Sequence, residues 1–311
     1  MPTPRRASAH RPESKRPSAR KQPRRRTGAD AGGLRSIAGS LPRGIDILAI
    51  ALIVGAIVAF AALRPGCSGL ESSGGSGAPA YESPYDWSGL DRSNGRYTYS
   101  ENGEPASRLG IDVSDHQGAI DWNAVADDGI EFAFIRIGYR GYTNGDLFDD
   151  DTYAANIDGA ESAGIDTGVY YFSQATTPQE AVEEAEFVLA RLAGRYLPLP
   201  VVYDHEPIAG EDGRANDLSP DEVSACAKAF CERIEEGGYS TMIYGNAADI
   251  ARYSEEAIGD RPVWFAEYDV DTPTGQFDFS VWQYANDGTA AGISTNVDMN
   301  ILFTTAPQEV R

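Results

Sequence analysis

Short apolar runs rich in β-branched and aromatic residues alternate with amphipathic segments from residue 108 onward, and this alternation limits the folds open to the chain. EFAFIRIG is followed by DTYAANIDGAESAG, and DTGVYYFS is followed by PQEAVEEAEFVLARLAG. Five such units in about 145 residues predict a parallel sheet with helices outside it. Further along, RPVWFAEY, FSVWQYA and VDMNILF are typical of strands, and the linkers between them are too short for full helices.

Eight candidate strands in roughly 200 residues predict an α/β fold in which the sheet closes into a barrel. We expect about five β/α units and a mostly β C-terminal part. In barrels of this kind the active site lies at the C-terminal ends of the strands. An open doubly wound sheet is the alternative, but the chain has no G-x-G-x-x-G or G-x-x-x-x-G-K-[ST] motif to bind a nucleotide there.

Charge is distributed unevenly along the 311 residues, whose formal net charge is −21. Residues 1–44 contain 12 Lys and Arg against two acidic residues, so they carry +10, and the remaining residues carry −31. Binding to DNA or RNA phosphates needs clustered Lys and Arg. The acidic part of the chain therefore excludes nucleic acid as its main partner.

Residues 45–63 form an apolar run, IDILAIALIVGAIVAFAAL, that contains a single charged residue. A helix of this length is long enough to cross a bilayer. Because the basic residues precede it, the positive-inside rule predicts a single transmembrane helix, with residues 1–44 as a disordered cytoplasmic tail and the acidic part outside the cell membrane. Secretion after cleavage of a signal peptide is the alternative, since Ala59-Phe60-Ala61 resembles a cleavage site.

Two shorter segments follow the apolar run. Residues 64–80 are rich in Gly and Ser, which predicts a flexible linker. Residues 81–107 contain two Asn-Gly pairs beside tyrosines, which predicts a small β-hairpin extension. We expect residues 108–311 to form the barrel.

Four carboxylates fall at the ends of predicted strands, where a charged group is costly unless it is paired or functional. They are Asp112 in LGIDVS, Asp204 and Glu206 in VVYDHEP, and Asp298 in NVDMN. Because the ends of parallel strands meet at one rim of a barrel, we expect these four side chains to form the catalytic site.

Asp204 and Glu206 are two residues apart, so in an extended strand their side chains leave the same face, with Cβ atoms roughly 6 to 7 Å apart. Two full charges at that distance repel by about 2 to 3 kcal/mol at an effective dielectric constant near 20. One of the two carboxyls can then stay protonated near neutral pH. A protonated acid beside an ionised one is what glycosidic cleavage requires.

LGIDVSDHQGAIDW, VVYDHEP and VWQY followed by NVDMNILF together resemble the signature motifs of the family 25 glycoside hydrolases, which are lysozymes (N-acetylmuramidases). The resemblance spans residues 108–303. It implies a flattened, TIM-like β/α barrel that cleaves the β-1,4 bond from N-acetylmuramic acid to N-acetylglucosamine in peptidoglycan. It also implies that Glu206 is the general acid and that Asp204 orients or stabilises the 2-acetamido group of the substrate. Asp112 and Asp298 would complete the acidic floor of the cleft. We expect the catalytic domain to be monomeric.

Aromatic side chains near strand ends are candidates for stacking on sugar rings, and packing in the barrel core is the alternative for each of them. Tyr171 and Tyr244 are favoured because both lie at predicted strand ends. Gln283 would offer amide hydrogen bonds, and His116 is a further candidate contact. The aromatic candidates are Tyr139, Tyr171, Tyr244, Trp264 and Trp282.

Two other classes of function remain open at this point. A membrane-anchored glycosyltransferase could use Asp204 and Glu206 to hold a divalent metal ion, since oxygen-only sites suit Mg²⁺ or Mn²⁺. An inactive cell-wall glycan-binding module is the second alternative. His116 and His205 are too isolated to make a zinc site. We therefore expect neither a metal ion nor a cofactor.

Overall fold

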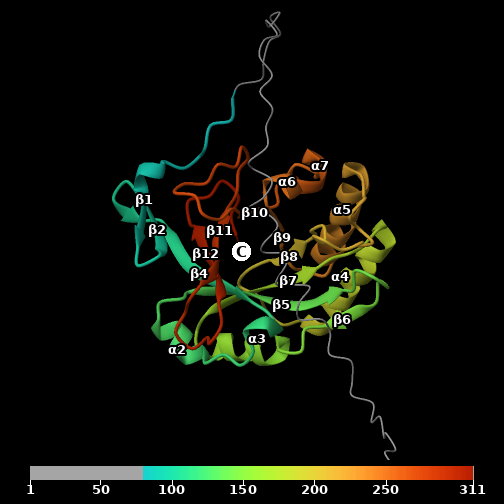
Figure 1. Cartoon of the computed structure of the whole chain (residues 1–311), viewed down its shortest axis with the longest axis horizontal. Coiled ribbons are helices and arrows are strands. Elements are labelled where there is room, and N and C mark those ends of the chain that lie inside the picture. The colour runs from blue at the N-terminus through green and yellow to red at the C-terminus, as the bar shows by residue number, and fades with distance from the viewer. Residues whose placement is uncertain (1–79, 311) are drawn as a thin grey trace, which may run out of the picture. The chain divides into compact units, whose positions relative to one another are not determined.

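The computed structural model describes residues 80–310, and eight strands in this part of the chain close into a barrel (Figure 1). Closure follows because β4 pairs with β12 on one side and with β5 on the other. In chain order the barrel strands are β4 (Ser107–Val113), β5 (Phe132–Arg140), β7 (Asp166–Phe172), β8 (Val201–Asp204), β9 (Thr241–Gly245), β10 (Val263–Ala266), β11 (Val281–Gly288) and β12 (Val297–Phe303).

The strands from β4 to β11 run parallel to their neighbours, whereas β12 runs antiparallel to both β11 and β4. A short strand, β6 (Leu147–Asp149), pairs with the far end of β5. The prediction of a closed α/β barrel is confirmed, and the open doubly wound alternative is wrong. Reversal of the last strand distinguishes this barrel from a regular eightfold β/α barrel.

Helices follow the first five parallel strands, and none of appreciable length lies between β10, β11 and β12, as the sequence predicts. Local sequence explains where the two longest helices begin. Thr177 caps α4 and Pro178 occupies its first turn, while Ser219 and Glu222 form a reciprocal capping box on α5. The helices are α2 (Trp122–Asp127), α3 (Tyr153–Ser162), α4 (Pro178–Leu192), α5 (Pro220–Glu236), α6 (Ala247–Ile250) and α7 (Glu255–Ile258).

Aromatic rings fill the barrel interior below the rim. The rings of Phe132 and Phe134 lie where Gly110 and Gly168 leave room, since a Cβ atom at either glycine would come within 2.3 to 2.5 Å of the ring. Trp264 stacks on Phe134 with ring centroids 4.6 Å apart. The interior is therefore a packed core that supports a cleft at one end.

A small antiparallel sheet occupies the segment in which the sequence predicts a hairpin. It contains β1 (Leu90–Ser93), β2 (Arg96–Glu101) and β3 (Glu104–Pro105) in that order. Both turns are Asn-Gly pairs with positive φ at both residues, which suits tight hairpins. Figure 1 shows this sheet beside β4 and β12, on the side of the barrel that the long helices leave open.

Aromatic packing attaches this N-terminal segment to the barrel, and Tyr85 is central to it. Its side chain is 5% exposed, its ring stacks on Phe303 at 4.3 Å, and its hydroxyl donates to the carbonyl of Phe279 at 2.5 Å.

We expect Tyr85→Ala to lower the free energy of unfolding by about 3 to 5 kcal/mol, as measured by urea denaturation. Tyr196→Ala is the matched control, since Tyr196 is 81% exposed. Equal effects of the two substitutions would contradict this account.

The expectations for the chain before residue 80 concern residues that the structure does not describe. The predicted cytoplasmic tail, the predicted transmembrane helix at residues 45–63 and most of the predicted linker lie there. Within residues 80–310, no helix combines the length and the apolar character needed to cross a membrane.

Candidate active site

Two pairs of carboxyl groups face one another across the rim of the barrel. Asp204 ends β8, and Glu206 lies two residues further along the chain. Asp112 lies near the end of β4, directly opposite Asp298 in the register with β12. Because β8 is separated from β4 by β5 and β7, the two pairs come from opposite sides of the barrel.

Asp298 reaches the rim for a reason other than the predicted one. It is the second residue of β12 and lies near the beginning of the strand, not the end. Since β12 runs antiparallel to its neighbours, its N-terminal end meets the C-terminal ends of the other strands. The four predicted carboxyls are thus brought together, and each pair has one deep and one more accessible member: Asp112 and Asp204 are each 5% exposed, whereas Glu206 and Asp298 are half-buried.

A cleft of about 180 Å³ opens between the two pairs. Seven of the ten residues predicted for the site line it. Its lining residues are Asp112, Arg136, Tyr170, Phe172, Asp204, Glu206, Pro207, Ile208, Tyr244, Trp264, Gln283 and Asp298.

The Asp204 and Glu206 carboxyl groups lie close enough for each to act on the pKa of the other, and two carboxyls that interact in this way release their protons in separate steps. Burial, together with the charges of Glu206 and Asp249, raises the pKa of Asp204 well above its usual range. Burial and the charge of Asp249 raise the pKa of Glu206 to about 8. The pair therefore holds a proton at neutral pH, and Glu206 is its more accessible member.

The Asp112 and Asp298 carboxyl groups likewise act on the pKa values of each other. Burial raises the pKa of Asp112 to about 6, while hydrogen bonds from Asn300 and Gln283 favour its ionised form. Burial and the charge of Asp112 raise the pKa of Asp298 well above its usual range. Asp112 is accordingly the ionised member of this pair and Asp298 the protonated one.

These raised pKa values predict how stability changes with pH. A carboxyl whose folded pKa exceeds its unfolded value stabilises the fold below the unfolded pKa, and this contribution is lost as pH rises through the folded pKa. For Glu206 the window runs from about 4.3 in the unfolded chain to about 8 in the fold. We expect the melting temperature to fall between pH 5 and pH 8, and Glu206→Gln to raise it at pH 8, by calorimetry. Glu211→Gln, in the exposed part of the same loop, is the control. A wild-type melting temperature that does not fall would contradict the prediction.

Gln283 is central to the hydrogen bonding beneath the cleft. Its amide nitrogen donates to Asp112 Oδ2 at 2.8 Å, and its amide oxygen accepts from the hydroxyls of Tyr244 at 2.8 Å and Tyr268 at 2.5 Å. Both ends of the amide are occupied. One hydrogen of the amide nitrogen thus orients Asp112, and because Gln283 lines the cleft, its contact with the substrate stays a prediction.

Tyr171 was the favoured stacking candidate, and the structure places it on the other side of the sheet. Its side chain is fully buried between the barrel and the outer helices, against Phe187 of α4 and Phe230 of α5. Its neighbour Tyr170 lines the cleft instead. Since successive side chains of a strand alternate between faces, an assignment that is off by one residue selects the wrong face.

The remaining candidates lie at different depths. Tyr244 and Trp264 line the cleft, but their side chains are only 8% and 2% exposed. Trp264 forms part of the floor, where its indole nitrogen donates to Asn300 Oδ1 at 2.7 Å. Tyr139 and His116 do not line the cleft. Tyr139 stacks on Phe148 beside it, and the half-exposed side chain of His116 lies 3.4 Å from Asp115.

Several further residues of the site were not predicted, among them the polar residues Arg136, Tyr170, Asp249 and Asn300. Arg136 interrupts the apolar run of β5, which is the same signal that identified the acids, and it pairs with Asp115 at 2.6 Å and Asp150 at 2.8 Å. Asn300 lies two residues after Asp298, on the same face of β12, and donates to Asp112 Oδ2 at 2.8 Å. Asp249 lies in α6, where helical geometry, not strand alternation, directs its side chain.

The two histidines in the described part of the chain are His116 and His205. Burial is the main cause that lowers the pKa of His205 to about 4, so its ring is neutral, and it stacks against Tyr203 with centroids 6.0 Å apart. Among the described residues, no group of three or more His, Cys, Asp and Glu side chains is arranged to hold a metal ion.

Two known proteins are similar to part of this chain in sequence. An autolytic lysozyme of Clostridium acetobutylicum is 29% identical over 191 residues, which are 61% of this chain and 54% of that protein. Lysozyme M1 of Streptomyces globisporus is 28% identical over 205 residues, covering 61% of this chain and 66% of that protein. This chain thus spans about half to two thirds of the length of these relatives.

A solved structure and a family pattern agree with these similarities. The bacterial lysozyme of Streptomyces coelicolor superposes with a TM-score of 0.50 at 26% identity, over 64% of this chain and 93% of that one. The sequence pattern described as "Glycosyl hydrolases family 25" matches residues 111–293, which are more than half of the chain and include all the cleft-lining residues on strands β5 to β11. With the barrel and its sequence pattern in agreement, the chain belongs to glycosyl hydrolase family 25.

Proposed function

We propose that this protein is a peptidoglycan muramidase, a lysozyme that hydrolyses the β-1,4 bond between N-acetylmuramic acid and N-acetylglucosamine. The observation that carries the proposal is the pair Asp204 and Glu206, which lines an open cleft at the rim of the barrel and whose pKa values are raised by burial. Membership of family 25 and the relatives named lysozymes support the same substrate.

Glu206 is the general acid in this proposal. It is the more accessible member of its pair, and a pKa of about 8 keeps it protonated at neutral pH. Such an acid can protonate the glycosidic oxygen as the bond to the leaving sugar breaks. The departing N-acetylglucosamine then leaves as a neutral alcohol.

The other three carboxyls act on the sugar from which the leaving group departs. Breaking the bond leaves positive charge on that ring, and the buried carboxylate of Asp112, the ionised member of its pair, favours the charge because the surroundings do not screen it. Asp204 would orient the 2-acetamido group so that its oxygen can attack the ring carbon. Asp112 and Asp298 would face the same ring from the opposite side of the barrel. Hydrogen bonds from Gln283 and Asn300 hold Asp112 in that position.

Purified peptidoglycan tests the proposal directly. The full-length protein is incubated with it in the presence of a chelator, and the released fragments are reduced with borohydride and identified by mass spectrometry. We expect fragments that end in reduced muramic acid, because cleavage leaves that sugar with the free reducing end.

Two results would overturn the proposal. Reduced glucosamine ends would assign the opposite bond, and no release from several types of cell wall would exclude a muramidase. Activity that disappears in the chelator would favour a metal-dependent glycosyltransferase, since nothing in the proposed steps requires a metal ion.

We also propose that the barrel is held outside the cell membrane by a helix formed from residues 45–63. The support comes from sequence, namely the apolar run and the basic residues before it. Fractionation of producing cells should place the full-length chain in the membrane pellet after an alkaline wash. A shortened chain in the medium would instead indicate a cleaved signal peptide.

A further inference from the structure

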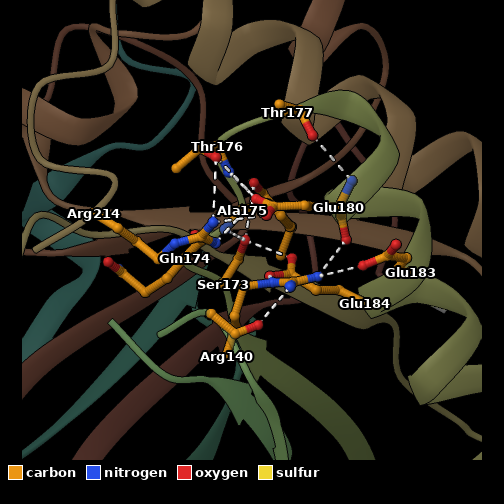
Figure 2. A network of polar contacts seen from close by, with 12 residues as sticks. Arg140, Ser173, Gln174, Ala175, Thr176, Thr177, Glu180, Glu183, Glu184 and Arg214 are labelled. Carbon is orange, nitrogen blue, oxygen red and sulfur yellow. Dashed lines mark hydrogen bonds and ion pairs between the residues drawn. The ribbon is translucent and has the colours of Figure 1, made fainter. Parts of the chain in front are cut away.

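Loops at the rim of the barrel are joined by a network of ion pairs and hydrogen bonds around Arg214, Gln174 and Glu180 (Figure 2). Arg214 comes from the loop between β8 and α5, which also carries Glu206. Its guanidinium binds Glu180 of α4 in a two-pronged contact, at 2.6 Å and 2.9 Å. Its backbone nitrogen donates to the carbonyl of Tyr142, in the loop after β5, at 3.0 Å.

Gln174 connects this network to Glu206. It lies in the loop after β7, is fully buried, and receives a hydrogen bond on its main-chain carbonyl from Arg214 at 2.9 Å. Its side-chain nitrogen donates to the main-chain carbonyl of Glu206 at 2.8 Å. One residue thus links the ion pair to the backbone of the proposed acid.

The position of Glu206 in the chain makes that contact important. Strand β8 ends at Asp204, so Glu206 lies beyond the last residue that the sheet ladder holds. The loop that follows runs to Ser219, and a loop of this length has many accessible conformations unless other contacts restrict it. The carboxyl of Glu206 must nevertheless stay close to that of Asp204.

We propose that Gln174 is a positioning residue for the general acid and that Arg214 and Glu180 hold Gln174 in place. The inference rests on the proposed function of Glu206. Gln174 does not line the cleft, so we place it behind the residues that would contact the substrate. It acts through the backbone of Glu206, and it keeps the Glu206 carboxyl against Asp204 and directed at the cleft.

The ion pair behind Gln174 is suited to this task at any working pH. Although burial opposes it, hydrogen bonds from Arg214 and Thr176 lower the pKa of Glu180 to about 2. Glu180 therefore stays ionised while the catalytic pair changes its protonation state. Arginine also fixes geometry better than lysine, because its planar fork makes two parallel bonds to a carboxylate.

The first test replaces Gln174 by Met in the full-length protein, which keeps the size of the side chain but removes its donor. On soluble peptidoglycan glycan fragments, we expect kcat to fall about 10- to 100-fold with KM within about twofold, since a small displacement of a catalytic group is enough for such a loss. Asn156→Leu is the matched control: Asn156 is a buried amide on α3 that donates to Thr152 Oγ1 at 3.0 Å. This control should retain the wild-type kcat.

The second test uses Arg214→Lys alone and combined with Gln174→Met. If Arg214 acts through Gln174, the two losses in kcat should not multiply in the double variant. Losses that multiply fully would show that the two residues act separately and would overturn the proposed chain of contacts. Unchanged kcat in Gln174→Met, or a fall matched by Asn156→Leu, would overturn the positioning role.

A readout independent of activity separates this inference from the proposed function. Carboxyl ¹³C NMR of the full-length protein follows the titration of Glu206, and Gln174→Met should shift it because the interaction with Asp204 is disturbed. If Gln174→Met shifts the titration of Glu206 but the wild type releases no muramic acid, the positioning role stands and the proposed muramidase activity is wrong. An unshifted titration would overturn the positioning role whether or not the wild type is active.

Discussion

Replacing Glu206 by Gln should lower the rate of peptidoglycan hydrolysis by about 10²- to 10⁴-fold, the usual contribution of a general acid. Glutamine keeps the shape of the side chain but has no proton to transfer at neutral pH. Substrate binding should change little, because the cleft and the other three carboxyls remain. Release of reducing ends from peptidoglycan, measured at several substrate concentrations, checks the expected result.

Glu211→Gln is the matched control, since it makes the same exchange of side chain at an exposed position in the same loop. The pH profile gives an independent check. Since the pKa of Glu206 is raised to about 8, wild-type activity should decline as pH rises through that value. Equal rates for Glu206→Gln and Glu211→Gln, or wild-type activity that increases above pH 8, would show that Glu206 is not the general acid.

Replacing Arg140 by Met should lower the free energy of unfolding by about 3 to 5 kcal/mol at pH 8, which is typical when one partner of a buried ion pair is removed. Arg140 is 4% exposed and donates to Glu184 at 2.7 Å, while Glu184 is fully buried and also accepts from Ser173 at 2.6 Å (Figure 2). Without Arg140, the Glu184 carboxylate would be left without its balancing charge.

The same substitution should be less damaging at pH 6. Burial raises the pKa of Glu184 to about 7 even with Arg140 present, and removal of the positive charge raises that pKa further. At pH 6 the variant can therefore protonate Glu184 and avoid a buried charge, whereas at pH 8 protonation costs more. Urea denaturation at both pH values measures the difference.

Arg195→Met is the control for this prediction, because Arg195 pairs with Asp158 and Glu161 at the surface. Exposed pairs contribute about 0 to 1 kcal/mol. A loss for Arg140→Met that is as small as that of the control, or that does not depend on pH, would show that Glu184 carries no charge that needs Arg140.

The barrel and the four acids could be predicted because each leaves a local signal. Strand and helix periodicities differ, so alternating runs identify the units and their number. An acid that ends an apolar run, such as Asp112 or Asp204, is costly there unless it has a role. These signals need no knowledge of which residues lie together in space.

The stacking candidates show the limit of such signals. Tyr170 and Tyr171 are adjacent and chemically identical, yet one lines the cleft and the other packs against α4 and α5. Which of them faces inward depends on the register of β7 with its neighbours. The sequence of that strand is apolar on both sides, because a barrel buries both faces, and so it contains no alternation that would distinguish them.

By itself, the sequence determined that this chain folds into a β/α barrel with acids at one rim, because periodicity and the cost of a buried charge are local properties. Only the tertiary structure decided that β12 runs in reverse and presents Asp298 from its beginning. It also decided that Gln174 reaches the backbone of Glu206 and that Arg214 holds Gln174. Contacts of this kind join residues that lie far apart in the chain. They depend on strand order and loop path, which are set by how the whole barrel packs.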